Sequence, residues 1–442
     1  MAEARAPVNT VKISNVFGRR VWDSRGRPTV EVELTLDDGS QGRAIAPAGA
    51  SMGTGEAHDL RDGGTRLNGF DVRRAVANVN GPIRDRLLGQ PVDDQAAIDH
   101  LLIDADGTPN RSRLGGNAMI ATSLALLNAR AASAHMPLWQ FLGRSRVEWI
   151  PAPEIQIFGG GAHARGRCDI QDFLIVPIAA PDFATALEWV AEVYHAAGAQ
   201  LARQGMLQGV ADEGGYWPNF ARNEDGLVAL TQAIEAAGFV AGRDIAIALD
   251  AAATQWRDHD GYRWRLDDRT LSVEALLDEY ERWLDRYAIV SIEDPVGEDD
   301  MDGMREFTRR FGHRIQVVGD DYLVTSGERI ERAAREGACN AVLIKPNQAG
   351  TVTETETAIV AARRVGYRII VSARSGETED ATLAHLAVGW QADQIKVGSF
   401  ARSERMAKWN EVLRIEEALG SAARYRGATP FPRAESIAVA ST

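Results

Sequence analysis

From about residue 151 onward the chain repeats one short pattern, an apolar run that is usually closed by a polar or charged residue. The runs are continuous rather than alternating, which is typical of strands buried on both faces of a parallel sheet. They recur at intervals of about 25 to 30 residues, the length of one βα unit when roughly 250 residues are divided among eight. The repeat therefore predicts an α/β barrel, with strands at residues 245–250, 289–293, 315–320, 341–345, 369–373 and 394–396.

The first third of the chain has a different pattern. Residues 29–36 alternate between apolar and polar side chains, which predicts a half-exposed antiparallel strand. The turn sequence Asp37-Asp38-Gly39 follows, and residues 41–46 resume a strand, so the segment is predicted to be a hairpin. Ile120, Leu124 and Leu127 fall at helical spacing in an Ala-rich run, which predicts a buried helix.

The change of pattern predicts two domains joined near Gly143 and the Pro151-Ala152-Pro153 segment. We expect an N-terminal α+β domain over residues 1–145, a barrel over residues 146–427 and a flexible tail over residues 428–442.

Composition excludes several classes of partner and site. The net charge of −13 argues against a nucleic-acid surface, which needs a basic face. The two cysteines, Cys168 and Cys339, exclude a disulfide framework or a Cys-based zinc site and fit a reducing compartment. No apolar stretch approaches the roughly 18 residues of a membrane span, and the N-terminus lacks a signal pattern. We therefore expect a cytoplasmic protein without nucleic-acid or membrane partners.

Charged residues close five of the predicted strands, namely Asp250, Glu293, Asp320, Lys345 and Lys396. In a barrel the carboxyl ends of the strands converge on one mouth, where chemistry takes place. Any one of these residues alone would be interpreted as a solvated strand end, but the five together favour a functional site. Three carboxylates form an all-oxygen site suited to Mg²⁺, which can stabilise the enediolate formed when a carbon next to a carboxylate loses its proton. A lysine beside a second cation is a plausible base.

Long strings elsewhere in the chain carry a family resemblance. They include residues 23–32 (DSRGRPTVEV), 49–53 (GASMG), 60–63 (LRDG), 212–215 (DEGG), 291–295 (SIEDP), 319–321 (GDD), 374–380 (RSGETED) and 402–405 (RSER). On these strings the chain resembles the enolase (phosphopyruvate hydratase) family over about residues 11–427. The resemblance implies an α+β domain followed by an enolase-type (β/α)8 barrel with an irregular start, in a homodimer or a higher oligomer.

The resemblance also implies roles for single residues. Asp250, Glu293 and Asp320 would bind the tighter of two Mg²⁺ ions, and Ser51 would contact the substrate and the second Mg²⁺, which arrives with it. Lys345 would be the general base and Lys396 the partner of the substrate carboxylate. Glu213 would assist departure of the hydroxyl, and Asp172 stands where the family has a catalytic Glu. His163, Gln171, Arg374 and Ser375 would bind a small anionic substrate of the phospho- or phosphono-glycerate kind.

Several positions depart from the family pattern near the expected phosphate and leaving-group end. Ala373 replaces a His, Asp172 a Glu, Ala48 a Ser and Gly159 an Asn, while Pro346 and Gly398-Ser399-Phe400 also differ. Because the first four changes shorten side chains while the three expected metal ligands, both lysines and Arg374 remain, they indicate a substrate with a larger or differently shaped head group. The main hypothesis is therefore a relative of carboxyphosphonoenolpyruvate synthase, an enzyme of phosphonate-antibiotic biosynthesis.

Two alternatives stay open. The first is a phosphopyruvate hydratase that converts 2-phosphoglycerate to phosphoenolpyruvate. The second, from another class, is a catalytically retired paralogue that serves as a structural or binding module.

Overall fold

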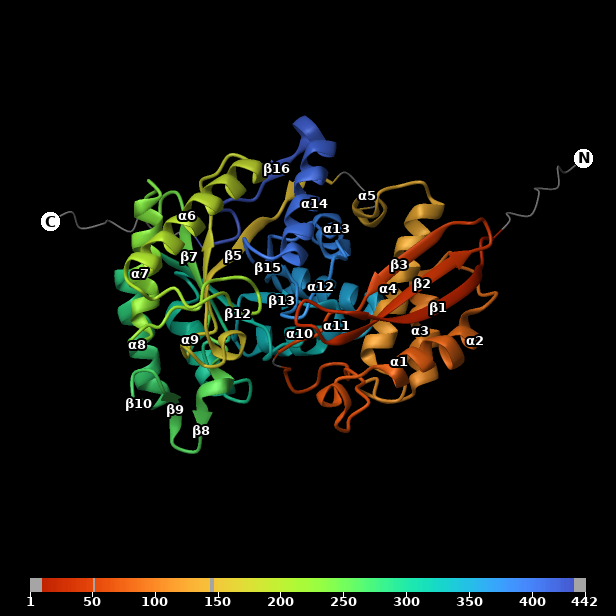
Figure 1. Ribbon diagram of the computed structural model, residues 1–442, viewed down its shortest axis with the longest axis horizontal. Helices are drawn as coiled ribbons and strands as arrows, with labels where there is room; N and C mark the ends of the chain where they lie inside the picture. Colours follow the sequence, from red (N-terminus) through yellow and green to blue (C-terminus); the bar gives the residue numbers. More distant parts are fainter. Residues whose placement is uncertain (1–9, 51, 144–146, 433–442) are drawn as a thin grey trace, which may run out of the picture.

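A computed structural model describes residues 10–50, 52–143 and 147–432 of the chain. It has two parts, shown in Figure 1: a smaller N-terminal part in red and orange, and a larger part in yellow to blue. The domain boundary expected at residues 145–146 falls on residues 144–146, which lie outside the described residues.

The N-terminal part is built on a three-stranded antiparallel sheet in the order β1-β2-β3. Its strands are β1 (Ile13–Trp22), β2 (Pro28–Leu36) and β3 (Gln41–Ile45). The predicted hairpin is confirmed, because β2 and β3 pair antiparallel around the turn at residues 37–39. The long edge strand β1 is an addition that the sequence pattern did not single out.

The predicted Ala-rich helix is confirmed as α4 (Gly116–Ser133), which packs on this sheet. Gly42 of β3 permits the close approach, since a Cβ atom there would lie 2.1 Å from the carbonyl oxygen of Ala125 in α4. The remaining helical elements of this part are η1 (Arg66–Gly69), α1 (Arg73–Asn78), η2 (Val79–Ile83), α2 (Arg84–Leu87), α3 (Gln95–Asp106) and α5 (Leu138–Gly143).

The larger part is a closed barrel of eight strands in the order β11-β12-β13-β14-β15-β5-β6-β7. The strands are β5 (Ala152–Gly159), β6 (Asp172–Val176), β7 (Ala246–Asp250), β11 (Ile289–Glu293), β12 (Gln316–Gly319), β13 (Ala341–Ile344), β14 (Arg368–Ser372) and β15 (Gln394–Ser399). An α+β part followed by an α/β barrel is therefore confirmed, and the predicted runs coincide with six of these strands.

The parallel arrangement of the barrel is broken at one strand, because β6 pairs antiparallel with both β5 and β7. This departure agrees with the irregular start of the barrel that the family resemblance implies. A parallel pair needs a crossover, usually a helix, whereas β5 and β6 are joined only by a loop with the short turn η3 (Gly161–Ala164). The chain therefore reverses direction, and the first residues of β6 lie at the same end of the barrel as the last residues of its neighbours.

Amphipathic helices surround the barrel, as Figure 1 shows. They are α6 (Phe183–Arg203), α7 (Glu224–Ala236), α8 (Val273–Arg286), α9 (Met301–Phe311), α10 (Gly327–Arg335), α12 (Val352–Val365), α13 (Thr382–Gly389) and α14 (Ser403–Leu419). Smaller elements are β4 (Trp149–Ile150), η4 (Ala253–Trp256), β8 (Arg257–Asp258), β9 (Gly261–Trp264), β10 (Arg269–Leu271), α11 (Pro346–Ala349), η5 (Gly420–Ala422) and β16 (Arg424–Tyr425). Within the described residues, none of the helices combines the length and apolar character needed to cross a membrane.

The segment expected to be a flexible tail, residues 428–442, is described only as far as Pro432. In this described portion Phe431 packs against a small apolar cluster of the barrel interior, and the carbonyl oxygen of Pro430 accepts a hydrogen bond from Gln316. Residues 433–442 lie outside the described residues.

Candidate active site

The five charged residues predicted at strand ends lie at one mouth of the barrel. Asp250 and Glu293 are the last residues of β7 and β11, Asp320 and Lys345 directly follow β12 and β13, and Lys396 lies within β15. Local sequence explains this placement, because continuous apolar runs form the strands and the first polar residue after each run emerges at the mouth.

Lys396 bridges the carboxylates of neighbouring strands. Its Nζ lies 2.9 Å from Asp250 Oδ2, 2.7 Å from Glu293 Oε2 and 3.6 Å from Asp172 Oδ2. Burial alone would lower the pKa of Lys396, but these carboxylates outweigh it and raise the pKa well above its usual value. Lys396 is therefore a fixed cation.

Lys345 pairs with Asp320, which also accepts a 3.0 Å hydrogen bond from Gln348 Nε2. Burial would lower the pKa of Lys345, yet Asp320 outweighs burial and raises it. Lys345 is thus a cation while it is paired in this way. It can act as a base only when Asp320 is engaged by another cation.

Asp250, Glu293 and Asp320, the expected ligands of the tighter Mg²⁺, present buried carboxylates at the mouth. Among the described residues, the groups whose ligand atoms lie within 4.8 Å of one another are different, namely His163, Asp172 and Glu213, and Asp294, Asp320 and Asp321. Glu293 is buried, and its Oε1 has no hydrogen-bond partner among the described residues. Burial and the adjacent Asp250 raise the pKa of Glu293 well above its usual value, as expected where a cation is needed between carboxylates. A cluster of buried carboxylate oxygens suits Mg²⁺ better than a softer metal.

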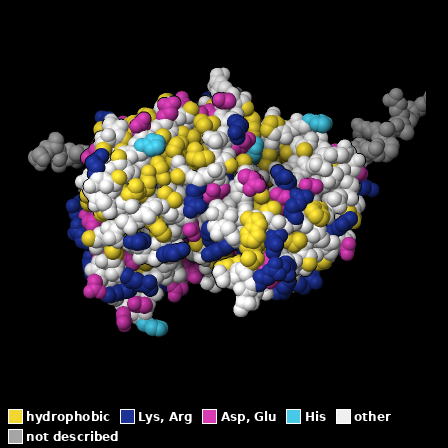
Figure 2. Space-filling view, in the orientation of Figure 1, with side chains coloured by type: hydrophobic (Ala, Val, Ile, Leu, Met, Phe, Trp, Pro, Cys, Tyr) yellow, Lys and Arg dark blue, Asp and Glu magenta, His cyan; other side chains and the backbone are white. Residues whose placement is uncertain are grey.

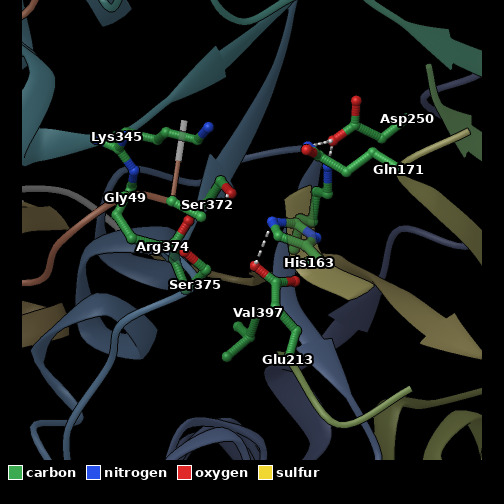
Figure 3. A pocket seen from close by; sticks show the side chains of 13 residues that line it. Gly49, His163, Gln171, Glu213, Asp250, Lys345, Ser372, Arg374, Ser375 and Val397 are labelled. Carbon is green, nitrogen blue, oxygen red and sulfur yellow. Dashed lines mark hydrogen bonds and ion pairs between the residues drawn. The ribbon is translucent and has the colours of Figure 1, made fainter. Parts of the chain in front are cut away.

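His163 lies between two carboxylates on the opposite side of the mouth. Its Nδ1 lies 2.9 Å from Asp172 Oδ1 and its Nε2 3.6 Å from Glu213 Oε1. Burial alone would lower the pKa of His163, but Asp172 and Glu213 raise it to about 9. Figure 3 shows His163 and Glu213 facing the side of the pocket that carries Lys345. The trio can therefore hold a proton across the cavity from Lys345.

The reversed strand β6 brings Gln171 and Asp172 into this site. Gln171 directly precedes β6, and its Nε2 donates a 3.0 Å hydrogen bond to Asp250 Oδ2. Asp172 opens β6 and lies opposite Asp250 in the register of β6 with β7. Neither residue ends a predicted strand, so only the family resemblance pointed to them.

Arg374 and Ser375 follow β14 and form another side of the pocket. Arg374 Nη1 lies 2.9 Å from Glu56 Oε2, which belongs to the N-terminal part. Ser375 Oγ accepts a 3.1 Å hydrogen bond from Arg25, whose Nη2 also donates to the carbonyl oxygen of Ala48. Arg374 therefore lines the pocket itself, while Arg25 contacts the neighbouring Ser375.

Sequence reasoning missed Glu56, Arg25 as a site residue, and Gln348. A buried arginine requires a carboxylate partner, so Arg374 signals that one exists. The signal does not say which of the 62 Asp and Glu residues it is. Gln348 lies three residues after Lys345, in the short helix α11, and that proximity could have drawn attention to it.

These residues enclose a cavity of about 360 Å³, which is drawn from close by in Figure 3. Its lining comprises Gly49, Ala50, His163, Gln171, Glu213, Asp250, Lys345, Ser372, Ala373, Arg374, Ser375, Lys396 and Val397. Glu293 and Asp320 lie behind this lining, in contact with the two lysines. Ser51, the expected ligand of a second Mg²⁺, lies outside the described residues.

Most of the shortened side chains do not enlarge this cavity. Of Ala373, Asp172, Ala48 and Gly159, only Ala373 is among the described residues that line it. A Cβ atom at Gly159 would lie 2.5 Å from Cβ of Ala211, so the space of a missing side chain is already filled. Ala48 is buried and pairs through its backbone with Gly376.

Comparison with known proteins agrees with this architecture over almost the whole chain. Residues 13–142 match the family model "Enolase, N-terminal domain", and residues 147–433 match "Enolase, C-terminal TIM barrel domain". A protein of Acidothermus cellulolyticus (strain ATCC 43068 / DSM 8971 / 11B) named "Enolase" is 49% identical over 421 residues, which cover 95% of this chain and 98% of that protein.

The prediction of a carboxyphosphonoenolpyruvate synthase in phosphonate-antibiotic biosynthesis is wrong. A relative that is 49% identical over almost the full length is named Enolase, which points to phosphopyruvate hydratase instead. The physical premise fails as well, because the positions read as an emptied pocket are mostly repacked or turned away from the cavity.

Proposed function

The chain belongs to the enolase family, and on that premise we propose that it is a phosphopyruvate hydratase, which converts 2-phosphoglycerate to phosphoenolpyruvate and water. The observation that carries the proposal is the arrangement of Lys345 and Lys396 among three buried carboxylates, at one cavity that His163 and Glu213 also line. The retired paralogue is disfavoured, because a protein without catalysis has no need to keep these buried charges together.

Each side of the cavity has its own task in the reaction. Lys345 Nζ accepts the proton from C2 of 2-phosphoglycerate, and the electrons of that C–H bond form the C2–C3 double bond. The C3–O bond breaks, and the oxygen leaves as water with assistance from Glu213 and the proton-bearing His163 beside it. Asp172 holds His163 in place from the opposite ring nitrogen.

The enolase family is generally Mg²⁺-dependent, and we propose two ions for this chain. Asp250, Glu293 and Asp320 would hold the first, and Ser51 would contact the second, which arrives with the substrate. Bound there, Mg²⁺ would neutralise the charge that develops on the substrate carboxylate. Lys396 adds a fixed positive charge beside that carboxylate, in a buried setting where charge stabilisation is strong.

The phosphate end of the substrate would meet Arg374 and Ser375, with Gln171 placed toward the metal end. Arginine suits this role because its planar guanidinium can present paired N–H donors to phosphate oxygens. The neighbouring Arg25 adds positive charge and orients Ser375 Oγ.

A homodimer and a cytoplasmic location belong to the same proposal. The enolase family is usually oligomeric. The two cysteines, Cys168 and Cys339, are both free and buried, which fits a reducing compartment. On the face shown in Figure 2, acidic and basic side chains are interspersed. Light scattering of the purified chain measures the oligomeric state directly.

The decisive experiment is a steady-state assay of 2-phosphoglycerate with Mg²⁺, which follows the ultraviolet absorbance of the enol product. We expect turnover in the ordinary range of enzymes, about 1–10³ s⁻¹. The variant Lys345→Ala should lose roughly 10³-fold or more in kcat and should no longer exchange the C2 hydrogen with solvent. Mg²⁺ binding by that variant, measured by calorimetry, should persist.

Two outcomes would overturn the proposal. An absence of turnover, together with an absence of thermal stabilisation by substrate and Mg²⁺, would favour the retired paralogue. Persistent exchange of the C2 hydrogen in Lys345→Ala would remove Lys345 as the base.

A further inference from the structure

We propose that Glu56 is a positioning residue for substrate phosphate: its carboxylate aligns Arg374 and at the same time holds the loop backbone at Gly53. This inference deepens the proposed function, because it assigns to the same site a residue from the N-terminal part. It rests on a contact between the N-terminal part and the barrel, the ion pair of Glu56 with Arg374.

The contact between Glu56 and Arg374 is a bidentate ion pair. Arg374 Nη1 lies 2.9 Å from Glu56 Oε2, and Nη2 lies 3.3 Å from Glu56 Oε1. The exposed fractions of the two side chains are 4% for Arg374 and 5% for Glu56. A buried paired contact of this kind fixes the plane of the guanidinium as well as its position.

The same carboxylate holds the active-site loop. Glu56 Oε1 accepts a 2.9 Å hydrogen bond from the backbone N–H of Gly53, two residues after Ser51. Gly53 itself is tightly placed, because a Cβ atom there would lie 2.7 Å from the side chain of Val324. Glu56 therefore fixes the backbone at Gly53, two positions after the residue that, by the proposed function, would contact the second metal ion.

A third link leads to the proposed metal ligands. Gln348 Nε2 lies 3.3 Å from Glu56 Oε1 and 3.0 Å from Asp320 Oδ1. One carboxylate thus connects the phosphate-binding arginine, the loop after Ser51 and, through Gln348, the carboxylate of Asp320.

Positioning and plain electrostatics predict opposite effects of removing the Glu56 charge. Arg374 lines the cavity, whereas Glu56 is not among the described lining residues. If Glu56 were only a nearby negative charge, its neutralisation would make the site more positive and would tighten phosphate binding. If Glu56 aligns Arg374, its neutralisation loosens the guanidinium, and phosphate binding weakens.

The test uses the full chain with Mg²⁺ and the variant Glu56→Gln, which keeps the side-chain shape. The first readout is the dissociation constant of inorganic phosphate by calorimetry, which we expect to rise about tenfold. The second is the kinetics with 2-phosphoglycerate, in which kcat should fall about 10- to 100-fold because misplaced reactants react slowly. Mg²⁺ affinity without substrate should change less than threefold.

The matched control is Glu298→Gln. Glu298 also holds this loop, through the backbone N–H and hydroxyl of Thr54, but it belongs to the barrel, and among the described residues its carboxylate contacts Thr54 rather than Arg374. The control variant should keep the phosphate dissociation constant and kcat within about threefold of the parent chain. An equal effect of both variants would mean that loop anchoring alone is at work and would overturn the role of Glu56 at Arg374.

Further outcomes of these measurements also test the role of Glu56. Tighter or unchanged phosphate binding in Glu56→Gln overturns the proposal. If the parent chain does not turn over 2-phosphoglycerate, the proposed function fails, while phosphate binding still tests Glu56. Should Glu56→Gln fail to fold, Glu56→Asp, which retracts the charge by one methylene, is measured against the same two expectations.

Discussion

At the scale of single residues, the site is a set of buried charges that compensate one another. His163 shows how strongly they interact. Its imidazole is 8% exposed, and the carboxylates beside its two ring nitrogens raise its pKa to about 9. A histidine that gains partners on folding contributes stability that depends on pH.

The variant His163→Gln should reveal this dependence. Because the folded-state pKa lies above the unfolded value of about 6.5, the stabilisation is fully present below pH 6.5 and is lost as pH rises through about 9. The free energy of unfolding of the parent chain should exceed that of the variant by at most roughly 3 kcal/mol near pH 6, and this difference should narrow toward pH 9.5. Urea unfolding at several pH values measures this difference; a gap that does not vary with pH would contradict it.

Ala373 is the one shortened residue that lines the cavity. If the chain acts on 2-phosphoglycerate, Ala373→His should return a polar donor to the pocket wall and raise kcat/KM by up to about tenfold. The measurement is a side-by-side steady-state assay of both chains. A large loss of activity would instead show that the pocket has adapted to the methyl group.

At the scale of elements, the two parts of the molecule are joined by shared helix capping. The N-terminus of α12 lies against α3 and α4 of the N-terminal part. Ser123 Oγ of α4 accepts the backbone N–H of Val352 and donates to Asp99, and Asp99 Oδ2 accepts the N–H of Thr353. The first backbone N–H groups of α12, which have no acceptor within their own helix, are therefore hydrogen-bonded by side chains of the N-terminal part.

The substitution Ser123→Ala should lower the free energy of unfolding by about 1–3 kcal/mol, because it leaves the buried N–H of Val352 without its acceptor and removes one of the donors to Asp99. Chemical denaturation provides the measurement. Ser133→Ala is a suitable control, since Ser133 lies at the end of the same helix and hydrogen-bonds only Asp38 at the surface. Equal effects of the two changes would argue against a capping role for Ser123.

At the scale of the whole molecule, the site is complete only where the N-terminal part meets the barrel mouth. Gly49 and Ala50 line the cavity together with barrel residues, and Ala48 pairs through its backbone with Gly376. Glu56 supplies the ion-pair partner of Arg374 across the same junction. By the proposed function, the barrel would supply the acid, base and metal groups, and the N-terminal part would border the phosphate end.

Mg²⁺ should accordingly stabilise the folded chain as a whole. A ligand at one hundred times its dissociation constant adds about 2.7 kcal/mol to the free energy of unfolding. Thermal unfolding with saturating Mg²⁺ and with a chelator should differ by several degrees, and Ca²⁺ at equal concentration tests whether the site prefers the smaller ion. Identical transitions in Mg²⁺ and in chelator would count against the carboxylate site.

The sequence by itself determined the strand runs, the hairpin, the Ala-rich helix and the meeting of five charged strand ends, because each follows from short-range periodicity and from the geometry common to barrels. Family strings pointed further, to His163, Gln171 and Glu213. Only the tertiary structure decided the reversal of β6, the filling of space at Gly159 and the pairing of Arg374 with Glu56. Those features depend on contacts between segments far apart in the chain, 318 residues for Glu56 and Arg374, and no local pattern of side chains encodes which distant partner will be met.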